Sequence, residues 1–221
     1  MRLDFQLVSR LVPQLLEGLE LTLLVAVASA IGALLWGLLL TWPRLSSRAS
    51  VRVPVIGYIE LVRNSPLLVQ LYLLYFALPM VGVFIPAFWC GVIAIVAQHG
   101  AFLCETYRAG IESIGRGQWE AARSIGLRGF KLFRLVILPQ ALLRVAPALT
   151  NQLVILVKDT SLVSAIGVME MTLMAKISIE RSAATFEVFV VVGVLYLILT
   201  TLVGLAGRLA ESRARARIGH V

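Results

Sequence analysis

Residues 117–140 read GQWEAARSIGLRGFKLFRLVILPQ, and the organisation of the chain can be worked out from this stretch. It is short and rich in alanine, arginine and lysine, whereas long apolar runs lie on both sides of it. A segment this short, between apolar runs, cannot be a second soluble domain. We therefore expect a loop between membrane spans that another molecule recognises.

The apolar runs indicate an integral membrane protein. Hydrophobic residues make up 59% of the 221 residues, charged residues only 14%, and the mean hydropathy is +0.91. About 20 apolar residues cross the hydrocarbon layer of a bilayer. In lipid, helices satisfy all their backbone hydrogen bonds internally. We expect an all-α, polytopic membrane protein in which residues 1–221 form a single transmembrane domain. Its five spans are expected at about 18–42, 54–78, 86–107, 146–168 and 188–207.

The second and third spans must be separated by helix-breaking residues, because no charged residue lies between them. No charged residue occurs between Asn64 and Cys104, a distance too long for one helix. Prolines break helices and glycines mark turns. We expect the division at Pro79, Gly82 and Pro86.

Lysine and arginine residues are concentrated on one side of these spans. They lie mainly after the first span, in the segment 108–145 and in the C-terminal tail. Cytoplasmic loops are enriched in these residues, so we expect the N-terminus outside and 108–145 and the C-terminus in the cytoplasm. Membrane topology therefore explains the net charge of +8, and we expect no nucleic-acid partner.

Neither a cleavable leader nor reactive thiols are expected. The first apolar run, 21–42, is longer than a signal-peptide core and lacks a basic lead-in and an A-x-A exit, so it should remain as an anchor. Cys90 and Cys104 lie in one apolar run without CxxC spacing. This arrangement favours buried, inert thiols over a disulfide or a metal site.

The opening stretch itself predicts two helical segments. Residues 118–125 are good helix formers, Glu120 suits the positive end of the helix dipole, and Gly126 is a plausible stop. Ala121 and Ala122 should give this helix a smooth face that another surface can approach.

The second segment is two-sided. Its apolar face carries Phe130, Phe133 and Ile137, and its basic face carries Arg128, Lys131 and Arg134. We expect an interfacial helix with its aromatic rings in the membrane, ended or bent at Pro139.

The spacing of this loop resembles the EAA loop of ABC importer permeases. The resemblance rests on Glu120-Ala121-Ala122, on Gly126, and on Leu138-Pro139 twelve residues beyond that glycine. In that family the loop is the coupling helix, which sits in a cleft of a cytoplasmic ATPase subunit. The resemblance therefore implies that Glu120, Ala121, Ala122 and Gly126 contact an ATPase. One departure is Val136, where the family usually has isoleucine.

Flanking segments narrow the resemblance to the polar amino-acid branch of these permeases. They read GLELTLLVA, YIELVRNSPLLVQLYLLYF, ETYRAGIESIGRGQWEAA, LPQALLRVAPAL and LVKDTSLVSAIG, and together cover about 18–204. The resemblance implies a type I importer fold in a bacterial inner membrane. It also implies a second permease, the same or homologous, two ATPase subunits that bind ATP and Mg, and a periplasmic solute-binding protein. The family often has tyrosine where Phe102 stands here, which leaves the pocket chemistry there less certain.

Charges inside the predicted spans require partners, because a charge at the bilayer centre costs about 2.5–3.5 kcal/mol. Glu60 and Arg63 are three residues apart on one predicted helix, and we expect a local ion pair. Lys158 lies eleven residues after Pro147, about 16 Å along a helix and thus near the midplane. Beside it stands Asp159, which must meet a polar partner or a wet cavity.

Two polar stripes could line a translocation path for an amino acid. Gln152 and Asp159 share a face of the fourth span, and Gln98 and Glu105 share a face of the third. We take Gln98, Glu105, Gln152, Asp159, Thr160 and Ser161 as candidates for this path, with hydrogen bonds that hold helices together as the equal alternative. Glu105 and Arg108 could also connect the third span to the coupling region. We expect His99 to be packed or hydrogen-bonded, and no metal site.

The sequence thus predicts a subunit of an ATP-driven importer for a polar or charged amino acid, working by alternating access. We expect no catalytic site, because no GxxxxGK phosphate loop or convergent catalytic cluster occurs. An ion-coupled secondary transporter of small polar solutes is the alternative. Such carriers often show an inverted repeat and more spans.

Overall fold

The computed structural model describes residues 5–182 and 184–218, and these are helical with short connections; no strand occurs in these ranges. The first half of the chain comprises α1 (Phe5–Arg44), α2 (Ala49–Arg63), α3 (Leu67–Tyr72), the π-helix η1 (Leu73–Ala77), the 3₁₀ helix η2 (Leu78–Val81) and α4 (Ala87–Glu112). The second half comprises α5 (Arg116–Ser124), α6 (Gly129–Leu132), the π-helix η3 (Phe133–Ile137), α7 (Leu138–Asp159), the 3₁₀ helix η4 (Thr160–Ile166), α8 (Met171–Ser182) and α9 (Thr185–Ile218).

Four continuous helical stretches are long and apolar enough to cross a membrane: Val12–Arg44, Ala87–Glu112, Gly129–Ile166 and Thr185–Ala216. A fifth crossing is available only as a bent pair, Ala49–Arg63 with Leu67–Val81, whose two parts meet at 101°. The protein is therefore an all-α, multi-pass membrane protein. The second expected span, 54–78, is not one straight helix. Helix α2 ends before Asn64, and a new helix with a different direction starts after Pro66.

The break between the second and third spans is confirmed. Gly82 has a φ of +84°, in the left-handed region that favours glycine, and residues 83–86 are not helical. Pro86 is the cap residue from which α4 starts. Pro79 thus lies at the start of η2, Gly82 follows its end, and Pro86 precedes the next span.

Helix α4 is the centre of the bundle. In its most apolar part 56% of the residues are buried, against 11% for α9. Helices α1 and α4 approach each other closely, because Gly37 and Gly100 leave room: a Cβ on Gly37 would stand 2.8 Å from Leu103 Cβ, and one on Gly100 would stand 2.6 Å from Trp36 Cδ1. Small residues allow this close contact in membranes, where dispersion rather than water drives helix packing.

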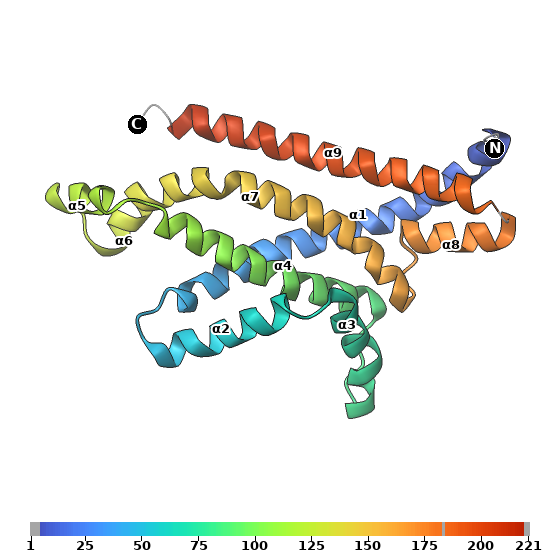
Figure 1. The fold of residues 1–221 in the computed structure, drawn as a ribbon, viewed down its shortest axis with the longest axis horizontal. Coiled ribbons are helices and arrows are strands. Elements are labelled where there is room, and N and C mark those ends of the chain that lie inside the picture. The colour runs from blue at the N-terminus through green and yellow to red at the C-terminus, as the bar shows by residue number, and fades with distance from the viewer. Residues whose placement is uncertain (1–4, 183, 219–221) are drawn as a thin grey trace.

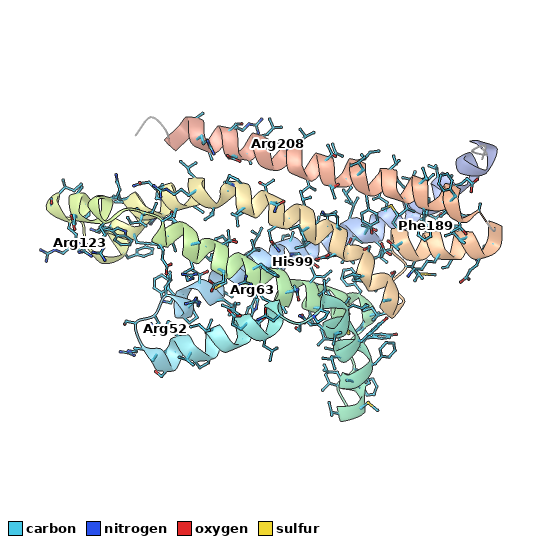
Figure 2. All side chains as sticks on the ribbon, in the orientation of Figure 1. Arg52, Arg63, His99, Arg123, Phe189 and Arg208 are labelled. Atoms are coloured by element: carbon cyan, nitrogen blue, oxygen red, sulfur yellow. The ribbon has the colours of Figure 1, made fainter. Side chains whose placement is uncertain are left out.

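The two ends of the molecule are different (Figure 1). Helices α5 and α6 lie at one end, toward which the C-terminal part of α9 also points, whereas α8 and the first turns of α1 lie at the other. Arg52 and Arg123 lie in the half of the molecule nearer to α5, and Arg208 lies near the middle of its length (Figure 2). That this half faces the cytoplasm stays a prediction.

Candidate functional site

The loop helix α5 forms as expected and stops where expected. It runs from Arg116 to Ser124, and Gly126 follows with a φ of +83°. The amide of Gly126 donates to the carbonyl of Arg123 at 2.9 Å, and that of Leu127 donates to the carbonyl of Ala122 at 3.0 Å. This pair of bonds is the Schellman motif, which satisfies the last helical carbonyls and requires a left-handed residue.

The two alanines of the loop differ in burial. Ala122 is buried in an apolar group that we call the loop cluster, which also contains Ile114, Leu132, Ile137 and Ala141. Ala121 and Glu120 are exposed. The expectation that both alanines form one approachable face is therefore wrong for Ala122. Ala122 anchors α5, and Glu120 and Ala121 form the outer surface.

The predicted interfacial helix is also different from the expectation. Ile137 is fully buried in the loop cluster and Phe133 packs against it, while Phe130 is 64% exposed. Ile137 and Phe133 pack against α5, so the expectation of insertion in the membrane is wrong for these two residues, whereas for the exposed Phe130 it stays a prediction. Periodicity reveals that a helix has an apolar face but not what covers it. Residues 133–137 also follow π-helical bonding, which shifts the register of later side chains.

The loop cluster joins α5 to two spans. Ile114 follows α4 directly and Ala141 lies in the first turn of α7. Polar contacts add to this join: the Gln140 amide donates to the Gln118 side-chain oxygen at 3.1 Å, and Arg144 donates to the carbonyl of Ser113. A displacement of α5 therefore acts on both α4 and α7.

A second polar group lies in the middle of the bundle, where α4 meets α7 (His99 is labelled in Figure 2). His99, only 1% exposed, has Nε2 3.0 Å from Asp159 Oδ2 and Nδ1 2.8 Å from the amide nitrogen of Gln152. With that amide donating to Nδ1, the Nε2–H of the ring donates to the carboxylate of Asp159. We call these three residues the polar bridge.

The polar bridge leaves one carboxylate oxygen open. The Asp159 side chain is 33% exposed, and within the described ranges its Oδ1 has no hydrogen-bond partner. Sequence reasoning placed Gln152 and Asp159 on one face, and the structure brings them together through His99. The partnership of His99 with Asp159 was missed because 60 residues separate them.

The remaining path candidates lie apart from the polar bridge or already have hydrogen-bond partners. The side-chain oxygen of Gln98 accepts from Gln70 of α3 at 2.6 Å. The hydroxyls of Thr160 and Ser161 donate to the carbonyls of Val157 and Lys158, and Thr160 is fully buried. The third-span stripe therefore faces α3 at Gln98 and not the partners of Asp159.

Glu105 belongs to an ion network at the end of α4. Its carboxylate accepts from Arg44 Nε at 2.7 Å and from Arg108 Nε at 2.9 Å, and Arg108 also contacts Glu112. Arg44 is the last residue of α1, so Glu105 ties α1 to α4 close to where the loop begins. Among the described residues these contacts join α1 to α4 and include none with α5 or α6, so a tie of Glu105 and Arg108 to the coupling region stays a prediction.

The expected ion pair between Glu60 and Arg63 is wrong for the described part of the chain. Glu60 accepts from the Asn64 amide at 3.0 Å, and the Arg63 guanidinium lies over the Phe102 ring, 4.8 Å from its centroid. A spacing of three residues permits a pair but does not exclude a partner on another helix. Here the cation–π contact with α4 takes the arginine.

Sequence reasoning missed Glu170, which is fully buried at the start of α8. Its carboxylate accepts from the amide of Leu173 at 2.9 Å, from the Tyr196 hydroxyl at 2.9 Å and from Thr22 at 3.4 Å. It therefore fastens α8 to α9 and α1. A single acidic residue in the apolar stretch 162–175 was the signal that could have found it.

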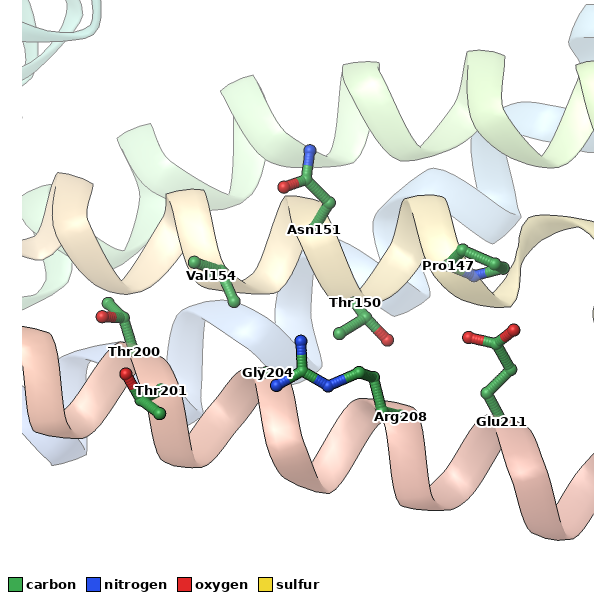
Figure 3. A pocket seen from close by; sticks show the side chains of 9 residues that line it. All are labelled: Pro147, Thr150, Asn151, Val154, Thr200, Thr201, Gly204, Arg208 and Glu211. Carbon is green, nitrogen blue, oxygen red and sulfur yellow. The ribbon is translucent and has the colours of Figure 1, made fainter.

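A groove of about 560 Å³ runs between α7 and α9 (Figure 3). One stripe of residues on each helix lines it: Pro147, Thr150, Asn151 and Val154 on α7, and Thr200, Thr201, Gly204, Arg208 and Glu211 on α9. The groove contains none of the six path candidates. In the described part of the chain, no group of three histidine, cysteine or acidic residues is placed to hold a metal ion.

Comparison with known proteins identifies relatives along nearly the whole chain. Residues 33–216 match the family described as binding-protein-dependent transport system inner membrane component. The glutamine transport system permease protein GlnP of Escherichia coli is 35% identical, with 97% of this chain and 99% of GlnP covered. The arginine transport system permease protein ArtQ of Bacillus subtilis is 33% identical (98% and 99% covered), and the nopaline transport system permease protein NocM of Agrobacterium fabrum is 34% identical (98% and 96%).

Solved structures agree with these relatives. An amino acid ABC transporter crystallised with histidines matches with a TM-score of 0.90 and 34% identity, covering 96% of this chain and all of that one. The methionine ABC transporter MetNI in an inward-facing conformation matches with a TM-score of 0.70 at 22% identity over 95% and 96% of the two chains, which supports the fold alone.

Proposed function

The chain belongs to the family of binding-protein-dependent transport system inner membrane components, and we propose from this premise that it carries a polar or charged amino acid as the membrane-spanning subunit of an ATP-driven importer. Permease subunits of this family are not catalytic, and ATP is hydrolysed by a separate ATPase subunit. The family match and the permease relatives favour this function over that of an ion-coupled secondary transporter.

The observation that carries the proposal is the exposed outer surface of α5. Glu120 and Ala121 point away from the loop cluster, at the end of the molecule opposite α8 (Figure 1). An ATPase that grips this surface moves α5. Through Ile114 and Ala141 the movement acts on α4 and α7 together, the two helices that carry the polar bridge. Alternating access then follows from rocking these helices. Gly126 contributes by ending α5 rather than by touching the partner.

Within the membrane, we place the cargo beside Asp159. Its open Oδ1 is a suitable acceptor for the ammonium group that every amino acid carries, and Ser161 lies two residues further along, in η4. Gln152 acts indirectly: it contacts His99, and His99 holds the Asp159 carboxylate. Gln98 and Thr160 need to exchange their present hydrogen bonds before they can touch cargo. Glu105 serves this path as a tie between α1 and α4.

The assembly we propose contains a second permease, either a copy of this chain or a relative, and two cytoplasmic ATPase subunits that bind ATP and Mg. A periplasmic solute-binding protein delivers the cargo and selects it. The location is a bacterial inner membrane, with the α5 end in the cytoplasm. Three observations support this orientation: the basic residues of the α5 half, the family described above and the exposed α5 surface.

The test is amino-acid-stimulated ATP hydrolysis by the complex, reconstituted in lipid vesicles with its ATPase and binding protein. We expect one or a few polar amino acids from a panel to stimulate hydrolysis and to accumulate inside the vesicles. Uptake by this chain without an ATPase subunit would instead establish a secondary transporter. A purified complex in which cross-linkers at Glu120 capture no ATPase would also overturn the proposal.

A further inference from the structure

The α7–α9 groove is elongated along the helix axes. Its lining on α9 extends from Thr200 to Glu211, eleven residues and therefore about 16 Å at helical rise. Its volume of about 560 Å³ lies within the range of small-molecule sites. A cavity of this shape, parallel to spans, matches an extended chain better than a compact solute.

Helices α7 and α9 touch at one point along the groove and leave space at another. A Cβ on Gly207 would stand 2.2 Å from a Thr150 side-chain atom, so α7 and α9 touch at this position. At Gly204, which lines the groove, a Cβ would meet only Val154 Cγ2, at 3.9 Å. The space beside Gly204 is therefore free, and Val154 and Thr200, which both carry methyl groups, line the same groove.

One end of the groove carries an uncompensated positive charge. The Arg208 side chain reaches into the space between the two helices (Figure 3), and no ion pair involves it among residues 5–182 and 184–218. Glu211 also lines this end, but it is paired with Arg215 one helical turn further on. The net charge of the three side chains is positive.

The position of Arg208 in the sequence suits an interaction with lipid head groups. It is the first charged residue after the apolar run 188–207 of α9. Arginine forms two parallel hydrogen bonds to a phosphate group, and basic pockets between membrane helices are suited to anionic head groups.

We propose that the α7–α9 groove is a binding site for an anionic phospholipid. The phosphate pairs with Arg208, and one acyl chain lies along Val154, Thr200 and Gly204. An amino acid would fill only the charged end and leave the apolar length empty. The site is distinct from the path beside Asp159, and it does not depend on which cargo is carried.

The test is native mass spectrometry of the purified complex after exchange into phosphatidylglycerol or phosphatidylcholine. We expect the wild-type complex to retain phosphatidylglycerol in preference to phosphatidylcholine. Arg208→Gln should weaken phosphatidylglycerol retention about fivefold, the equivalent of one charge contact near a membrane surface. Arg213→Gln is the matched control, since Arg213 is exposed on the same helix and does not line the groove, and it should retain the preference.

The substitution Gly204→Leu tests the contribution of the groove separately from that of the Arg208 charge. The free space at Gly204 accepts the side chain, which then occupies the place of the acyl chain, so retention of both lipids should fall with Arg208 intact. Equal losses for Arg208→Gln and Arg213→Gln would show a general effect of the basic tail and overturn the proposal. Unchanged retention in Gly204→Leu, or a photo-cross-linker at Thr201 that captures the second permease and no lipid, would overturn it as well.

Discussion

The loop cluster and the polar bridge are built in opposite ways. The loop cluster buries apolar residues around Ala122 and exposes its polar surface, as a small soluble domain does. The polar bridge buries hydrogen-bonding groups around His99, while apolar residues such as Leu197 and Leu202 of α9 form the outside of the molecule. The difference follows from the solvent, because lipid offers no hydrogen bonds to a polar group but water does. Removing one contact therefore has different consequences in the two regions.

The comparison can be tested by four substitutions, ranked by their effect on the stability of the complex. The largest effect is expected for Asp159→Leu, which leaves the Nε2 proton of buried His99 without an acceptor. An unmade buried hydrogen bond costs about 1–3 kcal/mol, and we expect the upper end here together with loss of uptake. Asp159→Asn, which keeps an acceptor oxygen, should unfold near the wild-type temperature and still transport poorly. Thermal unfolding of the purified complex measures this, and an unchanged midpoint for Asp159→Leu would remove the bridge from the stabilising contacts.

The second substitution is Ala122→Leu in the loop cluster. Ala122 is 3% exposed, and overpacking a filled core costs about 1–3 kcal/mol; the loop can shift in water, so we expect about 2 kcal/mol. The neighbouring Ala121→Leu is the control, because Ala121 is exposed. It should leave stability unchanged but reduce ATPase binding. Similar midpoints for the two variants would mean that α5 does not pack as described.

The third substitution is Gly126→Ala, and its effect is purely conformational. A Cβ at Gly126 meets nothing within 4 Å, but the φ of +83° is unfavourable for alanine by about 1–2 kcal/mol. Gly117→Ala is the matched control, since its surroundings are equally open and its backbone lies in α5. It should be neutral or slightly stabilising, as glycine is a poor helix former. Equal behaviour of the two alanines in thermal unfolding would contradict the left-handed stop.

The smallest effect on stability is expected for Glu120→Arg, within about 0.5 kcal/mol, because exposed substitutions rarely change stability. Uptake and ATPase co-purification should nevertheless fall at least about tenfold, a change of about 1.4 kcal/mol in binding. Glu120→Gln should lie between this variant and wild type. Normal coupling in Glu120→Arg would remove the α5 surface from the ATPase contact.

The sequence predicted the elements that depend on local chemistry. Gly126 ends α5 because a left-handed stop needs glycine, and Pro79, Gly82 and Pro86 divide two spans for similarly local reasons. The spacing of Glu120 to Pro139 was sufficient to indicate the family. These features involve neighbours in the chain, and periodicity and propensity report on such neighbours directly.

Contacts between distant segments could not be predicted in the same way. Nothing in the sequence near His99 points to Asp159, and the spacing of Glu60 and Arg63 gave no sign that the ring of Phe102 would take the arginine. Phe133 and Ile137 were correctly assigned to one face, but their cover is α5 and not lipid. In each case the sequence did not identify the partner, because the partner depends on the tertiary arrangement.

The 101° corner between α2 and Leu67–Val81 has a mechanical consequence. A straight rod turned about its own axis sweeps no area, but a rod with a crank sweeps an arc. The crank here is about 20 Å long at helical rise, so a twist of α2 by about 10° carries its tip through about 3–4 Å. Leu67 and Leu71 at its base pack against Val163 of η4, only a few residues beyond Asp159. A modest torque on α2 is thereby converted into a sideways stroke at the Val81 end of the segment, while its base beside Val163 stays close to the axis of rotation.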